Sequence, residues 1–377
     1  MYAVTALILR MLYSVIHALF STRDRIVLLS RQSDSIPLDF NLLKECLIEN
    51  MPDWEIAESY HYRQSLPSVA RDVFLVATSR VCVLDSYNPA VSIPKVDQNL
   101  LVIQLWHALG AIKRFGWQAV GTSAGRPKEM AQGFSMHANY STIIAAGKGC
   151  LPAYAEAFRC SEKRIIALGL PRMDYLLDSG SFTQHPSHHA TVNSENLKLE
   201  SGKTNIVYVP TFREREDGVS KLETFILQLA ASLSAEKSNL LVGAHPFSSN
   251  NDITADCSHI VYANQTRGID LIKHADYVIT DYSAIAFEAA LLGKKVLFYV
   301  PDIDVYRASP GLNIDVEEVF PLISFRLADE LAAYIEHDLR KDSYEAAGFW
   351  QYCKAYLIDN PQGSTARIVD YIKTKVI

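Results

Sequence analysis

Short apolar runs without polar alternation, separated by longer amphipathic stretches, recur along the chain from Arg25 onward. Continuous runs of Val, Ile and Leu are typical of strands covered on both faces, which is the pattern of parallel sheets. The helical stretches between them, such as 221–235 and 283–292, would supply the crossovers that parallel strands need. The expected strands are 25–30, 73–78, 100–106, 141–147 and 164–169 in the first half, and 205–210, 239–244, 276–280 and 295–300 in the second. The pattern predicts an α/β protein.

The chain has 377 residues, which is too long for one ordinary core. Residues 178–204 are polar, rich in Ser, Asn, Thr and His, and lack a sustained period, which is typical of a linker. We therefore expect two Rossmann-like domains, 25–177 and 205–345, whose parallel sheets face each other across a cleft. The tail, 346–377, is helical in pattern, and we expect it to pack back across that cleft.

Charge and cysteine usage exclude several classes of protein. The net charge is 36 − 42 = −6, which argues against a general nucleic-acid binder but leaves room for a local basic pocket. The six cysteines contain no CxxC pair, so neither a zinc module nor a disulfide scaffold is expected. His185, His188 and His189 lie in the linker without an acidic cluster nearby, so we predict no metal site there and no cofactor.

Residues 3–20 are the most apolar stretch and approach the ~20 residues that span a bilayer. Polar residues nevertheless line up on one stripe of the expected helix: Arg10, Ser14, His17 and Ser21. No basic region precedes the stretch, so a cleaved signal peptide is not expected. Two interpretations stay open: residues 1–24 lie as an amphipathic helix in the headgroup region of an anionic membrane, or the helix packs on its own protein. A true membrane span ranks third.

Ligands of open parallel sheets bind beyond the carboxyl ends of the strands, so residues that follow strands are the first candidates. His107 follows 100–106, and a histidine there can act as a general base near neutral pH. The alternative is a histidine that is hydrogen-bonded in a turn. Arg172 follows 164–169, where it either reaches a diphosphate or pairs with Asp174.

In the second half, Thr211 and Arg213 follow 205–210 and offer a hydroxyl and a guanidinium to phosphate oxygens. The alternative for Arg213 is an ion pair with Glu214 in a surface loop. His245 follows 239–244, and Pro246 fixes the backbone behind it, so His245 is expected at a defined strand exit.

The strongest local signal is Thr280-Asp281-Tyr282-Ser283, where an expected strand ends and a helix begins that closes at Gly293. Free N–H groups at the helix start favour a phosphate group, although capping alone would explain the same residues. Glu288 lies one turn further on, where it either accepts hydrogen bonds from a ribose diol or is an exposed helical glutamate.

Five motifs occur in one order along the chain: Trp106-His107, 169–174, 210–213, His245-Pro246 and 280–283. Together they resemble the CDP-glycerol glycerophosphotransferase family, which comprises the teichoic acid primases and polymerases, including members that use CDP-ribitol. The resemblance covers nearly the whole chain from about residue 25.

The resemblance implies a GT-B fold with the nucleotide site in the second domain and the general base in the first, acceptor-side domain. It implies a peripheral enzyme at the cytoplasmic face of the plasma membrane, with a CDP-alditol donor and a polyprenyl-diphosphate-linked acceptor. His107 would be the base, and Trp106, Ala108, Leu109 and Gly110 would line the alditol phosphate of the donor. The remaining motif residues would contact or frame the CDP portion: Arg172, Pro210, Thr211, Arg213, His245, Thr280, Asp281, Ser283, Ala284 and Glu288.

The mechanism expected from this resemblance is attack of the acceptor's terminal hydroxyl on the β-phosphate of the CDP-alditol, with release of CMP. His107 would take the proton. Arg172, Arg213, His245 and the helix start at Ser283 would stabilise the developing charge, without a metal because no carboxylate pair is placed to hold one.

Departures from the usual family motifs leave the alditol open. Ala108-Leu109-Gly110 stands where Gly-Thr-Pro is common, Ala284 replaces a second serine, Glu288 replaces an aspartate, and Gly243 replaces a basic residue. Glycerol or ribitol, one transfer or a long chain, and monomer or homo-oligomer are all compatible with the sequence. Two other functions stay open: a GT-B glycosyltransferase or epimerase that uses a UDP-sugar, and a catalytically silent membrane-associated scaffold.

Overall fold

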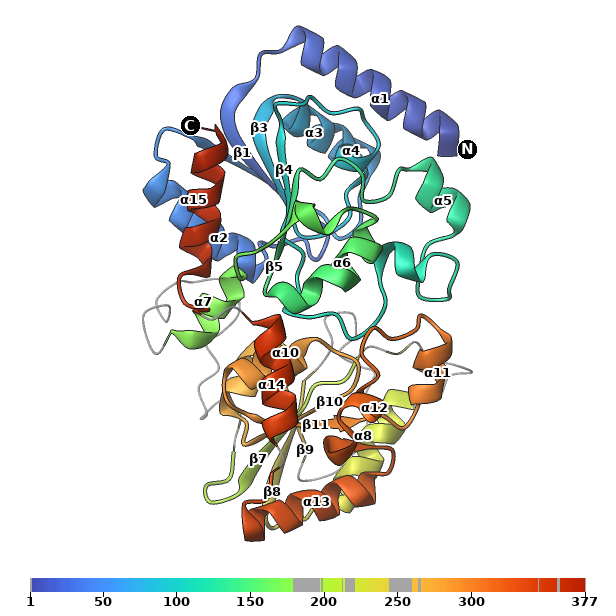
Figure 1. Cartoon of the computed structure of the whole chain (residues 1–377), viewed down its shortest axis with the longest axis vertical. Helices are drawn as coiled ribbons and strands as arrows, with labels where there is room; N and C mark the ends of the chain where they lie inside the picture. The colour runs from blue at the N-terminus through green and yellow to red at the C-terminus, as the bar shows by residue number, and fades with distance from the viewer. Residues whose placement is uncertain are drawn as a thin grey trace. The chain divides into compact units, whose positions relative to one another are not determined.

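The computed structural model describes residues 2–178, 197, 199–211, 213, 221–243, 260–263, 266–344, 346–357 and 360–376. The chain forms two compact units. Unit 1 comprises Met1–Tyr175, Ser309–Gly311 and Ala355–Ile377, and unit 2 comprises Leu176–Ala308 and Leu312–Lys354. Each unit contains one six-stranded parallel sheet, so the predicted α/β class with two Rossmann-like domains of the GT-B type is confirmed (Figure 1).

The sheet of unit 1 has the order β2-β1-β3-β4-β5-β6, and all its neighbouring strands are parallel. Its central strands consist largely of Val, Ile and Leu side chains with no solvent exposure, as expected for strands covered on both faces. The strands are β1 (Arg23–Ser30), β2 (Glu55–Tyr60), β3 (Ser79–Leu84), β4 (Leu101–Gln104), β5 (Thr142–Ala145) and β6 (Ile165–Ala167).

Helices flank this sheet, with α1 packed on α3 and α5 and with α15 packed on α2. The helices of unit 1 are α1 (Tyr2–Leu19), α2 (Leu38–Asn50), α3 (Leu66–Ala77), α4 (Pro89–Ser92), α5 (Lys128–Gly133), α6 (Leu151–Phe158), α7 (Pro171–Leu177, whose last residues belong to unit 2) and α15 (Ser364–Val376), with 3₁₀ turns at Gly116–Ala119, Lys148–Cys150 and Glu162–Arg164.

The sheet of unit 2 has the order β12-β11-β10-β7-β8-β9, again all parallel. Its strands are β7 (Thr204–Tyr208), β8 (Ser238–Val242), β9 (Ile260–Tyr262), β10 (Tyr277–Thr280), β11 (Lys295–Tyr299) and β12 (Ser324–Phe325). Its helices are α8 (Lys221–Ser232), α9 (Gly268–Leu271), α10 (Ile285–Leu291), α11 (Ile303–Ala308), α12 (Val316–Val319), α13 (Ala328–Lys341) and most of α14 (Ala346–Tyr356), with 3₁₀ turns at Ile272–His274 and Pro321–Ile323.

One expected strand is wrong. Residues 73–78 lie almost entirely in helix α3, which begins after Ser65. Ser65 and Ser68 form a capping box, and Val73 and Val76 are buried on one face of the helix. The true strand, β3, begins directly after this helix at Ser79. Strands β2, β9 and β12 were also not predicted, whereas the other eight expected strands each overlap an observed one.

The chain returns to unit 1 after unit 2. Asp174, at the end of the first pass, accepts hydrogen bonds from the backbone N–H groups of Gly363, Ser364 and Thr365 and so caps α15. Further along α15, the Tyr371 hydroxyl lies 2.6 Å from Thr142 Oγ1. Of the predicted linker 178–204, only residues 178, 197 and 199–204 are described.

Candidate active site

Most of the predicted site residues follow strands at the topological switch points, where ligands of open α/β sheets bind. In unit 1, β2 lies on one side of β1 and β3 on the other, so the switch point falls between β1 and β3. In unit 2, it falls between β7 and β10. His107 follows β4, which is the neighbour of β3, and Thr211 and Asp281 follow β7 and β10.

The His107 ring is held by residues from the two strands at the switch point. Its Nδ1 lies 2.9 Å from the carbonyl oxygen of Asp85, which follows β3, and 2.9 Å from the carboxamide of Gln32, which follows β1. The Gln32 atom nearest to Nδ1 is the amide nitrogen Nε2, which can donate to Nδ1 only when the ring hydrogen is on the other nitrogen. The bond to the Asp85 carbonyl instead requires the hydrogen on Nδ1, because a carbonyl only accepts. This tautomer leaves the lone pair on Nε2, the nitrogen that can accept a proton.

Burial, helped by the positive charge of Arg172, lowers the pKa of His107 to about 4, against the bond to the Asp85 carbonyl, which raises it. The imidazole is therefore neutral at neutral pH, as a general base must be. Sequence reasoning left open a histidine that is simply hydrogen-bonded in a turn. The structure shows such a hydrogen bond, but on Nδ1, which leaves Nε2 available for chemistry.

Trp106, which precedes His107, is held by its backbone and by its ring. Trp106 has a left-handed backbone, with φ of 58°, and its N–H donates to the buried Gln104 side chain at 2.9 Å. The indole stacks on Phe115 with 4.7 Å between ring centroids. A non-glycine residue held in this region is strained, and such strain clusters at functional sites.

Residues 108–110 were predicted to line the donor. The Ala108 carbonyl accepts from the Tyr154 hydroxyl at 3.0 Å, and the Leu109 carbonyl accepts from Cys150 Sγ at 3.3 Å. The Leu109 side chain has no solvent exposure, and Gly110 is also buried. The Leu109 side chain therefore packs in the core.

Asp85 is a residue of this site that sequence reasoning missed. Its side chain is 2% exposed; Ser30 Oγ donates to Oδ2 at 2.7 Å, whereas Oδ1 has no hydrogen-bond partner among the described residues. Burial raises the pKa of Asp85 to about 7, against the Ser30 hydroxyl, which lowers it. A correct assignment of β3 would have revealed Asp85, because it follows that buried strand directly.

Replacing Asp85 by asparagine should flatten the pH dependence of folding stability. The folded chain holds the Asp85 proton up to about pH 7, whereas an unfolded aspartate loses it near pH 3.9. Between these values the folded state binds more protons, so this group makes wild-type stability fall as the pH rises. Asparagine does not titrate. The free energy of unfolding, measured with urea at about pH 5 and about pH 8, should therefore fall less with rising pH in the variant than in the wild type. An unchanged pH slope would contradict this assignment.

Arg172 pairs with Asp39, not with Asp174. Its backbone N–H donates to Asp39 Oδ1 at 2.8 Å, and its guanidinium donates to Oδ2 from Nε at 2.9 Å and from Nη2 at 2.6 Å. Asp39 is 2% exposed and lies in the first turn of α2. The alternative pairing with Asp174 is wrong because Asp174 caps α15. Any phosphate at Arg172 would share the guanidinium with Asp39.

In unit 2, the fully buried Asp281 connects the two strands of the switch point. It accepts from Thr211 N at 3.0 Å, from Thr211 Oγ1 at 2.7 Å and from Tyr282 N at 2.6 Å. Arg213 Nη1 donates to the same carboxylate at 2.8 Å. The structure thus brings together three predicted ligand-binding residues, Thr211, Arg213 and Asp281, but joins their polar groups to one another.

Arg213 lies between two carboxylates. Besides Asp281, it binds Asp302 in a bidentate pair, with Nε at 2.7 Å and Nη2 at 3.0 Å from the two oxygens. Burial alone would lower the pKa of Arg213, but Asp281 and Asp302 outweigh it and raise that pKa. Tyr282 donates to Asp302 at 3.0 Å and stacks on Tyr306 with 3.9 Å between centroids. Sequence reasoning missed Asp302, which shapes this loop with Arg213.

The remaining predicted residues of unit 2 surround this network. Thr280 is fully buried and donates to the Val209 carbonyl at 2.8 Å, and Pro210 is buried beside it. Ser283 Oγ accepts from Ile285 N at 3.4 Å, while Ala284 occupies the N-cap of α10 without a side-chain bond. Glu288 is 4% exposed, so the alternative of an exposed helical glutamate is wrong.

The second predicted catalytic histidine, His245, and Pro246 lie outside the described residues, as do Glu214 and the three linker histidines. Among the residues that the structure describes, no group of three or more His, Cys, Asp or Glu side chains is placed to hold a metal ion.

A profile of the family described as CDP-Glycerol:Poly(glycerophosphate) glycerophosphotransferase matches residues 11–374. The chain belongs to this family. Membership confirms both the family resemblance and the enzyme class predicted from the sequence, a phosphotransferase that takes its alditol phosphate from a CDP-alditol.

Two relatives of this glycerophosphotransferase family member come from Bacillus spizizenii. The teichoic acid ribitol-phosphate primase is 28% identical over 381 residues, which cover 96% of this chain and 94% of the primase. The teichoic acid poly(ribitol-phosphate) polymerase is 26% identical over 378 residues, which cover 96% of this chain but only 58% of the polymerase. The family member thus matches the primase over nearly its full length and the polymerase over little more than half.

Solved structures show the same fold. The wall teichoic acid polymerase TagF superposes with a TM-score of 0.71 at 19% identity, covering 94% of this chain and 90% of the TagF chain. The UDP-GlcNAc 2-epimerase of Neisseria meningitidis superposes with a TM-score of 0.57 at 12% identity, covering 93% and 99%. At these identities the likeness concerns the fold alone.

Proposed function

We propose that the chain transfers one or more alditol phosphate units from a CDP-alditol to the terminal hydroxyl of a polyprenyl-diphosphate-linked acceptor in teichoic acid synthesis. The observation that carries the proposal is the position of the His107 ring, whose Nδ1 lies 2.9 Å from the Asp85 carbonyl and whose pKa is lowered by burial. With the hydrogen on Nδ1, the neutral ring can accept a proton on Nε2. His107 lies at the carboxyl edge of a parallel sheet, within a family of phosphotransferases.

In the proposed step, the acceptor hydroxyl oxygen attacks the β-phosphorus of the CDP-alditol, and its proton passes to His107 Nε2. The bond from the β-phosphorus to the bridging oxygen breaks, CMP leaves with that oxygen, and a phosphodiester remains. Charge grows on the transferred phosphoryl group and on CMP, so the protein's contribution is positioning and electrostatic stabilisation. In unit 1, we assign that stabilisation to Arg172.

The network of Asp281, Arg213 and Asp302 has a different role in this proposal from the one predicted. Because Arg213 already faces two carboxylates, it holds the loop after β7 in place and does not neutralise a diphosphate directly. Thr211 and Asp281 likewise support the start of this loop. Glu288 keeps the proposed role of ribose acceptor.

The proposed function is tested by the product. The full chain is incubated with CDP-ribitol or CDP-glycerol and a short lipid-linked acceptor, and CMP release and product mass are measured. CDP-ribitol is expected to be the better donor because the ribitol-phosphate primase is matched over 94% of its length. One added unit indicates a primase and a ladder indicates a polymerase. UDP release from UDP-sugars without CMP release would overturn the proposal in favour of the UDP-sugar alternative, and no turnover would favour a silent scaffold.

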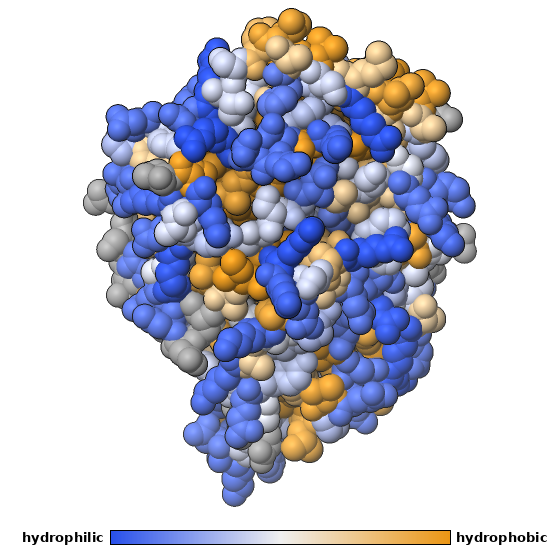
Figure 2. Space-filling view, turned by 45° about the horizontal axis from the view of Figure 1, so that its top comes forward, coloured by the Kyte–Doolittle hydropathy of each residue, from blue (hydrophilic) through white to orange (hydrophobic). Residues whose placement is uncertain are grey.

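We further propose that α1 binds the cytoplasmic surface of the plasma membrane without crossing it. The helix is long and apolar enough to span by length and composition. One of its faces, however, packs on unit 1 through Ala6, Leu9, Tyr13 and Ile16. The opposite face exposes an apolar row: Val4, Leu7, Ile8, Met11, Val15 and Leu19, each more than half exposed. Figure 2 shows apolar side chains gathered at the top of the molecule, where α1 lies.

Two of the polar residues predicted on α1 contact unit 1. Arg10 Nε donates to the Ile93 carbonyl at 3.1 Å, and His17 lies 3.0 Å from both the Ala77 carbonyl and Asp97 Oδ2. The polar stripe therefore separates the packed face from the exposed apolar row. A row of this kind, rimmed by polar residues, suits a helix that lies in the headgroup region.

Replacing Ile8 by aspartate should weaken binding to anionic vesicles by about tenfold or more, because a charge then replaces a side chain that the membrane would bury. Vesicle flotation measures the effect. The matched control is Ser14→Asp, which adds the same charge to the exposed polar stripe of the same helix. Both substitutions are at exposed positions, so thermal unfolding should stay near that of the wild type. Equal losses in both variants would contradict the assignment of the apolar row.

A further inference from the structure

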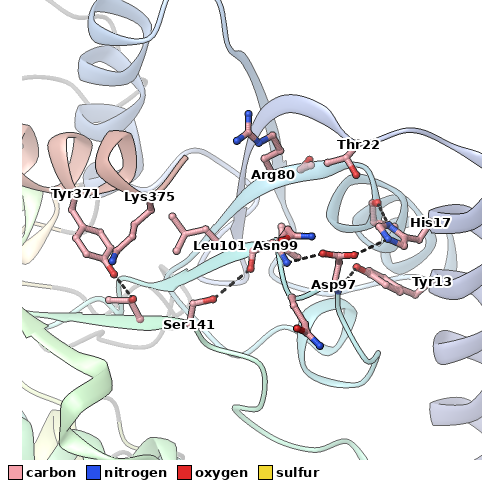
Figure 3. A pocket seen from close by; sticks show the side chains of 15 residues that line it. Tyr13, His17, Thr22, Arg80, Asp97, Asn99, Leu101, Ser141, Tyr371 and Lys375 are labelled. Atoms are coloured by element: carbon pink, nitrogen blue, oxygen red, sulfur yellow. Dashed lines mark hydrogen bonds and ion pairs between the residues drawn. The ribbon is translucent and has the colours of Figure 1, made fainter. Parts of the chain in front are cut away.

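A cavity of about 820 Å³ lies at the opposite end of the unit 1 sheet from His107. Its floor is formed where β3, β4 and β5 begin, at Ser79, Leu101 and Thr142, and its walls come from α1 and α15 (Figure 3). This volume is within the range of small-molecule sites. Because the strands of this sheet rise about 3.3 Å per residue, the cavity is separated from the His107 edge by roughly the length of a strand, 13–20 Å.

The cavity holds more positive than negative charge. Arg80 and Lys375 contribute two cations, and Asp97 is the one carboxylate that lines it among the described residues. Asp97 is already engaged: the N–H of Asn99 donates to it at 2.6 Å and His17 Nε2 lies 3.0 Å away. First that N–H and then His17 lower the pKa of Asp97, so the carboxylate stays ionised on the α1 side of the cavity.

Lys375 is the cation that remains for a ligand. Its ammonium lies 5.5 Å from the centre of the Tyr371 ring and makes no ion pair with any described residue. Arg80 is bound on one side, to Asp24 at 2.7 Å and to the Val376 carbonyl at 2.6 Å. The Arg80 guanidinium also lies 5.1 Å from the centre of the Trp54 ring, so Arg80 is already engaged.

Neutral hydrogen-bonding groups also line the cavity. The hydroxyls of Thr142 and Tyr371 lie 2.6 Å apart on the α15 side, and Ser141 Oγ contacts the Leu100 carbonyl at 3.4 Å (Figure 3). Gln98 adds an exposed carboxamide. Groups that both donate and accept, set next to cations, suit an anion that carries hydroxyl groups.

We propose that this cavity binds a phosphate ester of a small polyol, such as a glycerophosphoryl group, with the phosphate at Lys375 and the hydroxyls toward Ser141 and Asp97. The inference extends the proposed membrane association, because α1 supplies Tyr13 and His17 to the cavity and the apolar row to its outer face. Headgroups beside α1 would thus lie within about one helix diameter, ~10 Å, of the cavity. The ligand is either an anionic glycerophospholipid headgroup or a soluble alditol phosphate.

The test uses the full chain, two probes and two variants. Glycerol phosphate is titrated by calorimetry, and vesicles of phosphatidylglycerol in phosphatidylcholine are used for flotation. Lys375→Glu should weaken binding by about tenfold or more, since it replaces a charge-assisted contact by repulsion. The matched control is Lys373→Glu, on the same helix but outside the cavity, where Lys373 contacts Asn50. It should stay within about twofold of the wild type.

The two variants and the two probes together test the cavity proposal. A loss in Lys375→Glu alone supports the site, and the probe that shows the loss identifies the source as soluble ester or lipid headgroup. Saturable binding of neither probe, or equal losses in both variants, overturns it. Wild-type CMP release in Lys375→Glu is expected because the cavity is remote from His107. If vesicles bind through the apolar row but neither probe depends on Lys375, the cavity proposal fails while the membrane proposal stands.

Discussion

Replacing His107 by asparagine is expected to lower kcat for alditol phosphate transfer by roughly 10²–10⁴-fold, the usual contribution of a general base. The asparagine amide nitrogen can take the place of Nδ1 and keep the bond to the Asp85 carbonyl, so the loop should hold its shape while the basic Nε2 is lost. Binding of the CDP-alditol, measured by calorimetry, should change by no more than a few-fold. Turnover within a few-fold of the wild type would show that another group takes the proton.

The pH profile of the wild type provides a second measurement on the same residue. Because the pKa of His107 is lowered to about 4, the neutral base persists as the pH falls below the usual histidine value of about 6.5. The acid limb of kcat/KM should therefore lie nearer pH 4 than pH 6.5. The lowered pKa of His107 also reduces the free energy of unfolding as the pH falls from about 6.5 to about 4, because the unfolded chain binds the proton more readily. The folded fraction is followed by circular dichroism at each pH, and an acid limb at about 6.5 would contradict the assigned burial.

Replacing Asp281 by alanine is expected to destabilise the protein by about 3–5 kcal/mol, which is typical when one partner of a buried ion pair is removed. The change leaves the buried Arg213 with Asp302 alone and removes the acceptor of the Thr211 and Tyr282 N–H groups. The free energy of unfolding, measured with urea, should fall by this amount, and loss of activity should follow the loss of folded protein.

The matched control is Asp304→Ala, which removes an exposed carboxylate that pairs with Arg307 and Arg326. Its unfolding midpoint should stay close to that of the wild type because exposed ion pairs contribute little. If Asp281→Ala were as stable as the wild type but inactive, Asp281 would contact the substrate directly, and the supporting role assigned to it would be wrong.

The parallel architecture was predicted correctly because strands that are buried on both faces consist of continuous apolar runs, which can be recognised in the sequence. The same rule failed at 73–78, because a short apolar run fits a buried helix face as well as a strand. Arg71 and Asp72, which precede this run, and the Ser65 cap were the local signs of a helix. The error shifted the expected strand end away from Asp85, so the residue whose carbonyl fixes His107 was not recognised.

The candidate site was predictable in its residues but not in its pairings. Strand ends identified His107, Arg172, Thr211 and Asp281 from sequence alone. Their partners come from distant positions: Asp39 is 133 residues from Arg172 along the chain, and Asp302 is 89 from Arg213. No local pattern reports such contacts, so the sequence indicates that these guanidinium groups suit phosphate but not that each also binds a carboxylate from a distant loop.

The return of the chain to unit 1 has a consequence for how this protein is made and dissected. Unit 1 includes residues 309–311 and the chain from Ala355 onward, in addition to the amino-terminal half. During synthesis on the ribosome, the first half therefore lacks the helix that Asp174 caps until the last turns of α15 have emerged, by which time unit 2 has been translated in full. An excised amino-terminal fragment would leave the hydroxyl of Thr142 and the face of α2 without the helix that covers them, so the two units cannot be separated by a single cut.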